Sequence, residues 1–118
     1  MDTSKDGLSM FFNKWQVSVI NLIWDKYPEG SDIKSIWDEV NRGLIRKISR
    51  SSVTKFVNKL VDSGLFRFEE EVDRGGARRI YYSVYSETTF KKLLIRFLVS
   101  KLLREFPEET RIVINRFR

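Results

Sequence analysis

Apolar residues recur at spacings of three and four along the first half of the chain, the pattern of helices that bury one face. The first such stripe is strongest over residues 13–26, with Ser9 as the expected N-cap. Residues 28–30 then interrupt it with proline and glycine. Its expected buried positions are Phe11, Trp15, Val19, Ile20, Ile23 and Tyr27.

Two further helices follow. Ser31 is the expected N-cap of the second helix, and Asp32 places negative charge at its positive end. Ser49 is the expected cap of the third helix, which Gly64 ends in the left-handed conformation so that Leu65 folds back onto the core. The buried sides are expected to contain Ile33, Ile36, Trp37 and Val40 in the second helix, and Val53, Phe56, Val57, Leu60 and Val61 in the third.

After the third helix the apolar period changes to two, which is typical of strands. Apolar and polar side chains alternate over residues 66–71, and residues 73–76 form a turn. Residues 80–85 supply a returning strand rich in β-branched and aromatic side chains. The order of three helices, a hairpin and a long helix predicts an α+β, mostly α chain with the winged helix-turn-helix fold.

The C-terminal region carries more apolar surface than a small domain can cover. Ser86 is the expected cap of a long helix through Phe106, and Pro107 suits the first turn of a further short helix. Residues 111–118 are compatible with either helix or strand. Because exposed apolar patches mark interfaces, we expect a two-fold contact with a second copy, unless the tail folds back over the patch. The expected contact residues are Phe11, Phe12, Phe90, Leu94, Phe97, Leu98, Leu102 and Phe106.

Composition narrows the classes of function. The 118 residues fit one domain, and a content of 42% hydrophobic and 32% charged residues is that of a globular protein in water. Without a long apolar run or a signal-peptide pattern, we expect a cytoplasmic protein with no membrane partner. The absence of cysteine and histidine removes disulfides, zinc fingers and imidazole chemistry. We expect no metal, no cofactor and no enzymatic activity, since neither an acidic metal loop nor a nucleophile and base at suitable spacing is found.

The formal charge of +6 fits a polyanionic partner. Residues 42–61 contain six basic residues and no acidic one. A solvated helix face usually mixes both signs, so this one-signed run favours contact with phosphates over an ordinary surface.

The outward face of the third helix is the candidate reader of a DNA groove. Helix-turn-helix proteins read bases with the N-terminal turns of this helix. We expect Ser51, Ser52 and Lys55 to reach base edges and Asn58 to pair bidentately with adenine. Asp62 is repelled by DNA, so the end of the helix points out of the groove. The expected phosphate contacts are Arg50, Thr54 and Lys59, with Arg46 and Lys47 in the loop before the helix.

The tip of the hairpin is the second candidate. Arg74, Arg78 and Arg79 flank Gly75 and Gly76, which let the backbone turn sharply. Arginine at such a tip enters a narrow minor groove or binds flanking phosphate. Nearby carboxylates partly cancel this charge and are expected to pair with some of the arginines, and the alternative is an ordinary hairpin turn.

Residues 15–90 resemble the penicillinase-repressor (BlaI/MecI-type) family of winged-helix regulators. The matching segments are Leu22-Ile-Trp24 at the end of the first helix, Ser51-Ser-Val53 with Leu60-Val-Asp-Ser-Gly-Leu65 in the recognition helix, and Tyr81-Tyr-Ser83 with Ser86-Glu87 at the second wing strand. The additional Gly-Gly turn and the short, basic C-terminal region depart from the family pattern. The resemblance implies a homodimer that binds a palindromic operator and represses transcription.

We therefore expect a sequence-specific, double-stranded DNA-binding transcription regulator. Its expected parts are an N-terminal extension (residues 1–12), a winged helix-turn-helix DNA-binding domain (residues 13–86) and a C-terminal helical dimerisation region (residues 87–118). Two alternatives stay open: a winged-helix module that binds protein through these surfaces, and an architectural protein that binds any duplex.

Overall fold

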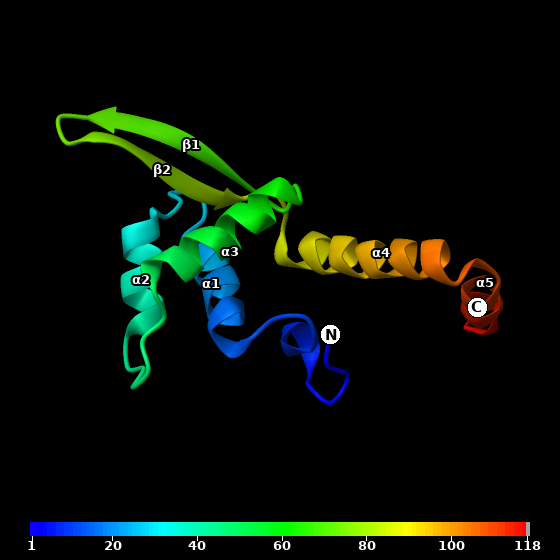
Figure 1. Cartoon of the computed structure of the whole chain (residues 1–118). Coiled ribbons are helices and arrows are strands. Elements are labelled where there is room, and N and C mark those ends of the chain that lie inside the picture. Colours follow the sequence, from blue (N-terminus) through cyan, green and yellow to red (C-terminus); the bar gives the residue numbers. More distant parts are fainter. Residues whose placement is uncertain (118) are drawn as a thin grey trace. The chain divides into compact units, whose positions relative to one another are not determined.

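The three helices and the hairpin expected from the sequence are present, with the hairpin lying along one side of the helices (Figure 1). The computed structural model describes residues 1–117. The chain divides into two units, Met1–Val84 and Tyr85–Arg118, and is α+β and mostly helical. Its elements are the 3₁₀ helix η1 (Gly7–Met10), the helices α1 (Lys14–Asp25), α2 (Ile33–Asn41) and α3 (Arg50–Asp62), the strands β1 (Phe66–Asp73) and β2 (Gly76–Ser83), and the helices α4 (Glu87–Glu105) and α5 (Pro107–Arg116).

The core of the first unit is built from the apolar faces of α1, α2 and α3, which contact one another. Full burial of one valine, leucine or isoleucine side chain stabilises the fold by about 2 kcal/mol. Tyr27 was expected in the core but is 63% exposed, because α1 ends before it. Phe11, Trp15, Ile33, Trp37 and Val61 are only half-buried. The buried helical residues are Val19, Ile20, Ile23, Ile36, Val40, Val53, Phe56, Val57 and Leu60.

The first two helices begin at other caps than expected. Ser9 lies inside η1, and Asn13 is the N-cap of α1, where its backbone N–H donates to Gln16 Oε1 at 2.8 Å. Asp32, not Ser31, is the N-cap of α2: its carboxylate accepts a hydrogen bond from Ser35 N at 2.8 Å. Both corrections replace the expected residue with another good capping type, which propensity alone does not rank.

Ser31 has a different role. Its backbone N–H donates a hydrogen bond to Tyr81 O of β2 at 3.0 Å, and Tyr81 N donates one to Ser31 O at 2.8 Å. Both residues are buried. Gly30 precedes this bridge with a φ of +76°, and a Cβ there would lie 2.5 Å from Ile80 Cγ2. The segment between α1 and α2 is therefore fixed to the base of the hairpin, which explains why Ser31 does not cap the helix.

The third helix begins and ends as the sequence predicts. Ser49 Oγ accepts a hydrogen bond from Ser52 N at 3.0 Å. At the other end Gly64 has a φ of +79°, and the N–H groups of Gly64 and Leu65 donate to Val61 O and Leu60 O. These two bonds form a Schellman motif, which turns the chain from α3 into β1.

The hairpin pairs every residue from Phe66 opposite Ser83 to Asp73 opposite Gly76, so Arg74 and Gly75 form a two-residue turn. The second strand, β2, starts four residues earlier than expected and stops before Val84. Its polar first half gives no apolar alternation, but antiparallel pairing with β1 extends it to the turn.

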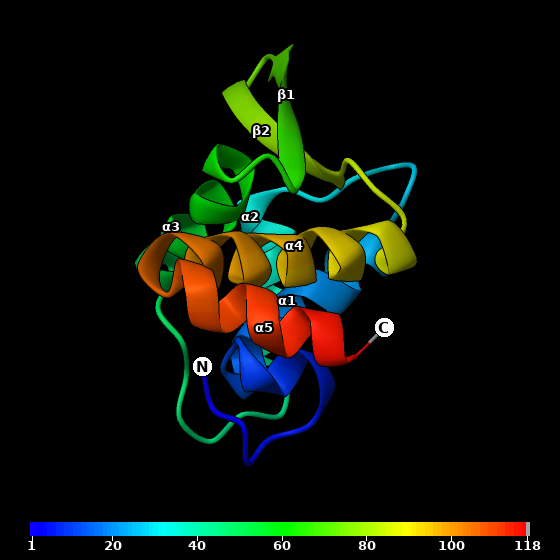
Figure 2. The same cartoon turned by 90° about the vertical axis from the view of Figure 1, so that its right-hand side faces the viewer.

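The second unit consists of two helices. Ser86 Oγ accepts from Thr89 N at 3.2 Å, which confirms it as the cap of α4. Pro107 occupies the first turn of α5, and the segment that was compatible with helix or strand is helical through Arg116. α5 contacts α4 (Figure 2), and Thr110 Oγ1 donates to Leu102 O at 3.1 Å between them.

Over the described residues, none of the helices is long and apolar enough to cross a membrane.

Candidate nucleic-acid interface

The outward face of α3 carries polar and basic side chains opposite the buried stripe of Val53, Val57 and Leu60. Ser51 and Lys55 are exposed, and Asn58 is half-buried on the same line along the helix. At a rise of 1.5 Å per residue, Ser51 and Asn58 lie about 10 Å apart along the axis. This span fits within a major groove about 12 Å wide.

The cations around this face are exposed, and most are unpaired. Within residues 1–117, none of them forms an ion pair with a carboxylate except Arg42, which is 2.8 Å from Glu39. Lys47 is held by the chain, because its Nζ donates to Asn41 O at 2.9 Å. Within residues 1–117, the exposed cations whose side chains have neither an ion pair nor a hydrogen bond are Arg46, Arg50, Lys55 and Lys59.

A buried asparagine, not assigned a role by the sequence, fixes the turn that leads into α3. The side chain of Asn41 donates to Trp37 O and Ile48 O, and its Oδ1 accepts from Ile48 N at 2.6 Å. Trp37 Nε1 donates to the same carbonyl, Ile48 O, at 2.8 Å. These bonds fix the loop that contains Arg46 and leads into the start of α3.

Several candidate readers already have local partners. Ser52 Oγ lies 2.8 Å from Ser49 Oγ, and Thr54 Oγ1 donates to Arg50 O at 2.9 Å. Asn58 Oδ1 accepts a hydrogen bond from Tyr81 OH at 2.8 Å. Bidentate pairing with adenine requires the amide oxygen as well as the nitrogen, so Asn58 does not present the free amide that the sequence interpretation assumed.

The register of the hairpin separates its arginines by face. Successive side chains on a strand alternate between faces, and Tyr81 faces α3 because its hydroxyl contacts Asn58. Arg79, two residues earlier, is therefore on the α3 side. Arg78 lies on the opposite side, together with Ile80, toward α2.

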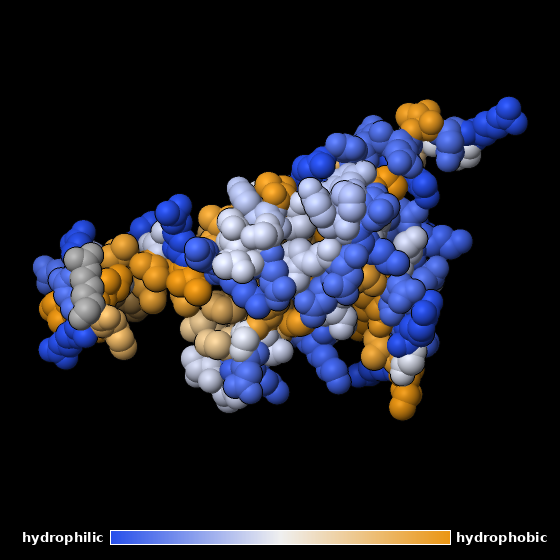
Figure 3. Space-filling model, turned by 180° about the vertical axis from the view of Figure 1, so that it is seen from behind, coloured by the Kyte–Doolittle hydropathy of each residue, from blue (hydrophilic) through white to orange (hydrophobic). Residues whose placement is uncertain are grey.

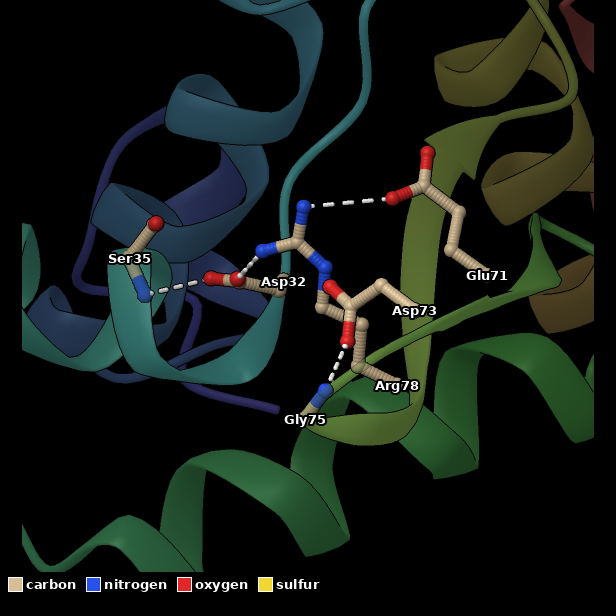
Figure 4. A network of polar contacts seen from close by, with 6 residues as sticks. All are labelled: Asp32, Ser35, Glu71, Asp73, Gly75 and Arg78. Carbon is tan, nitrogen blue, oxygen red and sulfur yellow. Dashed lines mark hydrogen bonds and ion pairs between the residues drawn. The ribbon is translucent and has the colours of Figure 1, made fainter.

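On that opposite side, Arg78 forms two ion pairs (Figure 4). Its Nη1 is 2.7 Å from Asp32 Oδ2 and its Nη2 is 3.1 Å from Glu71 Oε2. Burial raises the pKa of Asp32, but the hydrogen bonds from Ser35 and the charge of Arg78 outweigh it, so the pKa is lowered overall. The hydrogen bond to Glu71, with the charge of Asp32, raises the pKa of Arg78. Arg78 was predicted to contact DNA; its guanidinium joins the hairpin to the start of α2 in this structure.

Arg79 is placed differently from Arg78. Its guanidinium carbon lies 4.1 Å from the centre of the Phe68 ring, which is a cation–π contact. Within residues 1–117, this guanidinium forms no ion pair with a carboxylate. Arg74 is exposed in the turn, where Gly75 N donates to Asp73 Oδ1 at 2.8 Å, and Gly76 begins β2. Within residues 1–117, the hairpin cations without an ion pair are thus Arg79 on the α3 side and Arg74 at the tip.

The residues expected at a dimer contact fall into three groups. Phe90 is fully buried within the chain, so it is not part of an exposed patch and that expectation is wrong. Phe11 and Phe12 are half-buried, and the ring of Phe12 meets Phe56 edge-on at 5.7 Å between centroids. Leu94 and Leu98 are half-buried, whereas exposed apolar side chains gather on α4 and α5 (Figure 3). The exposed ones are Ile95, Phe97, Leu102, Phe106, Ile112, Val113 and Phe117.

A polar groove of about 470 Å³ lies between the end of α1, helix α2 and the hairpin. Carboxylates such as Glu29 and Asp38 line it together with Lys26, Arg42 and Arg78. Among the described residues, no group of three potential metal-ligating side chains occurs. The mixed charges of this groove contrast with residues 50–59 of α3, whose charged side chains are all basic.

No protein-family model matches the chain, and no curated protein matches it. The fold is similar to a solved structure described as a possible transcriptional regulator from Methanosarcina mazei Go1. The two share 17% sequence identity with a TM-score of 0.59, over 82% of this chain and 78% of the other. This likeness shows a shared arrangement of helices and hairpin.

Proposed function

We propose that the chain is a sequence-specific, double-stranded DNA-binding transcription regulator with a winged helix-turn-helix fold. The observation that carries this proposal is the set of exposed cations of α3, Arg50, Lys55 and Lys59, which have no ion pair within residues 1–117 and no acidic residue among them. Arg79 continues this set on the same side of the hairpin. A helix with such a face beside a basic hairpin suits the major groove and the adjacent backbone. The description of the similar structure as a possible transcriptional regulator agrees with this role.

The residues of the face divide into two proposed roles. Ser51, Ser52, Lys55 and Asn58 face the base edges. Their different lengths and donors give each a separate contact in the groove. The proposed phosphate contacts, which set the position of the protein on the duplex, are Arg46, Lys47, Arg50, Thr54, Lys59, Arg74 and Arg79, with Gly75 and Gly76 allowing close approach of the turn. Arg78 has the role of holding the hairpin through Asp32 and Glu71.

We further propose that the protein acts as a homodimeric repressor on a palindromic operator. Two of the exposed rings on the second unit, Phe97 and Phe106, are 67% and 58% exposed, which is costly for a monomer in water. A second copy would cover them, and operator half-sites pair with two-fold protein symmetry. In this proposal residues 1–12 are an extension, residues 13–86 bind DNA and residues 87–118 form the dimer contact.

Selection of bound duplexes from a random pool, with the mass of the protein in solution, tests the proposal. The expected result is one enriched, two-fold symmetric site and the mass of a dimer. Uniform recovery of all sequences would instead indicate an architectural protein. A stable monomer that binds no duplex at low salt would indicate a protein-interaction module.

A further inference from the structure

The hydrogen bond between Tyr81 and Asn58 joins β2 to the middle of the proposed reading face. Tyr81 is 1% exposed, and its backbone is bonded in both directions to Ser31. Its ring lies 6.0 Å from the ring of Phe68. The hydroxyl is therefore held in place by the core and the hairpin, and it donates to Asn58 Oδ1 from a fixed position.

This bond decides which end of the Asn58 amide remains available. An asparagine amide accepts hydrogen bonds at Oδ1, which has two lone pairs, and donates them from Nδ2 on the opposite branch of the same plane. The bond from Tyr81 directs the Oδ1 branch of the amide toward β2, so the Nδ2 branch is the one left for the groove, and within the described residues Nδ2 makes no hydrogen bond.

We propose that Tyr81 is a positioning residue that makes Asn58 a donor-only reader of the major groove. This inference rests on the proposed function. A donor finds an acceptor on guanine (N7 and O6), adenine (N7) and thymine (O4), whereas cytosine offers only its N4 amino donor there. At the base that Asn58 faces, the protein accepts guanine, adenine or thymine and rejects cytosine. It has no special preference for adenine, because Tyr81 holds Oδ1 toward β2 and away from the position that the bidentate contact requires.

The bond would also serve a purely structural purpose, the packing of the hairpin on α3. A structural role changes the stability of the fold and the affinity for all duplexes alike. A positioning role changes which base is preferred at one place in the site. The order of base preferences is therefore the readout that separates the two.

The experiment uses the duplex that the wild-type chain selects, with all four bases placed in turn at each position. The position at which Asn58→Ala loses discrimination is the one that Asn58 faces. At that position, wild-type protein is expected to bind the duplex with cytosine about ten-fold more weakly than the duplexes with the other three bases. One unsatisfied donor costs about 1.4 kcal/mol, which corresponds to this ten-fold difference in affinity. Tyr81→Phe frees Oδ1, so the cytosine penalty shrinks and adenine becomes the best base.

Two variants control this comparison. Tyr82→Phe removes a hydroxyl from the next residue, which lies on the other side of the hairpin, and leaves the preference of the wild type unchanged. Asn58→Asp keeps an acceptor for Tyr81 but offers DNA no donor, so it shifts the preference toward cytosine. Thermal unfolding of each variant shows that the chain is folded at the temperature of binding.

Each outcome is decisive. If Tyr81→Phe reproduces the wild-type order of preferences, or if Asn58→Asp does not move it toward cytosine, Tyr81 does not set what Asn58 reads. If Asn58→Ala changes no position of a selected site, Asn58 does not face a base, and the inference fails while the proposed function stands. If the wild-type chain selects no site, the proposed function itself fails, and this inference with it.

Discussion

Replacement of the two adjacent arginines of β2 gives a sharp prediction about which face of the hairpin meets DNA. Arg79 lies on the α3 side over Phe68, and Arg78 lies on the other side between Asp32 and Glu71. Arg79→Gln removes a cation that is free to neutralise a phosphate. Arg78→Gln removes the same charge from a place where two carboxylates already use it, and so provides the matched control.

The magnitude follows from the number of cations that the proposal assigns to phosphates. They are Arg46, Lys47, Arg50, Lys59, Arg74 and Arg79. Each phosphate neutralised contributes about −0.9 to the slope of log affinity against log salt concentration, so full engagement gives a slope of roughly −5. Arg79→Gln is expected to make this slope shallower by about 0.9. Between roughly 50 and 200 mM salt this amounts to about a three- to four-fold smaller loss of affinity.

Fluorescence anisotropy of a labelled duplex, titrated at several salt concentrations, measures the slope for both variants. Arg78→Gln is expected to keep the wild-type slope and to lower the midpoint of urea unfolding, because the hairpin loses its link to α2. A flatter slope for Arg78→Gln, together with an unchanged slope for Arg79→Gln, would refute this prediction. The alternation of faces along β2 would then not decide which arginine meets DNA.

Three further predictions concern folding and assembly. Ser49→Ala removes the cap of α3 and is expected to lower the free energy of unfolding by about 1 kcal/mol, whereas Ser49→Asn keeps it; equal urea midpoints would contradict this. Folding lowers the pKa of Asp32 below its ordinary value of 3.8, so its stabilising contribution is full above that pH and is lost as the pH falls through the folded pKa. Asp32→Asn, which still caps α2, should therefore flatten the acid limb of the stability curve, and an unchanged limb would speak against the ion pair. Phe97→Glu is expected to give a monomer by light scattering, with Lys101→Glu as a control for charge, and a persistent dimer would place the contact elsewhere.

The hydrophobic pattern predicted the helices and the hairpin because short-range periodicity determines them. The cap of α3 and the Schellman end at Gly64 follow from local chemistry in the same way. The cap of α2 does not follow from local chemistry. Ser31 and Asp32 are adjacent and both cap well, and the choice was decided by the pairing of Ser31 with Tyr81, far along the chain.

The candidate site shows the same division. A helical wheel was enough to predict the exposed face of α3, because this face lies opposite the buried apolar stripe. The separation of Arg78 from Arg79 depends on the register of the hairpin, which a two-residue turn fixes. The partner of Arg78, Asp32, and the partner of Asn58, Tyr81, lie 46 and 23 residues away. Sequence periodicity carries no signal for contacts at such separations.

A titration of ¹⁵N-labelled protein with its selected duplex, followed through the amide chemical shifts, tests directly whether the outward face of α3 binds DNA. We expect the largest shift changes on residues 46–59, at the start and along the outward face of α3, and on residues 74–79 at the hairpin tip. We expect small changes along α2 and in the polar groove near Glu29 and Asp38. Changes centred on that groove, with α3 unaffected, would contradict DNA binding by α3.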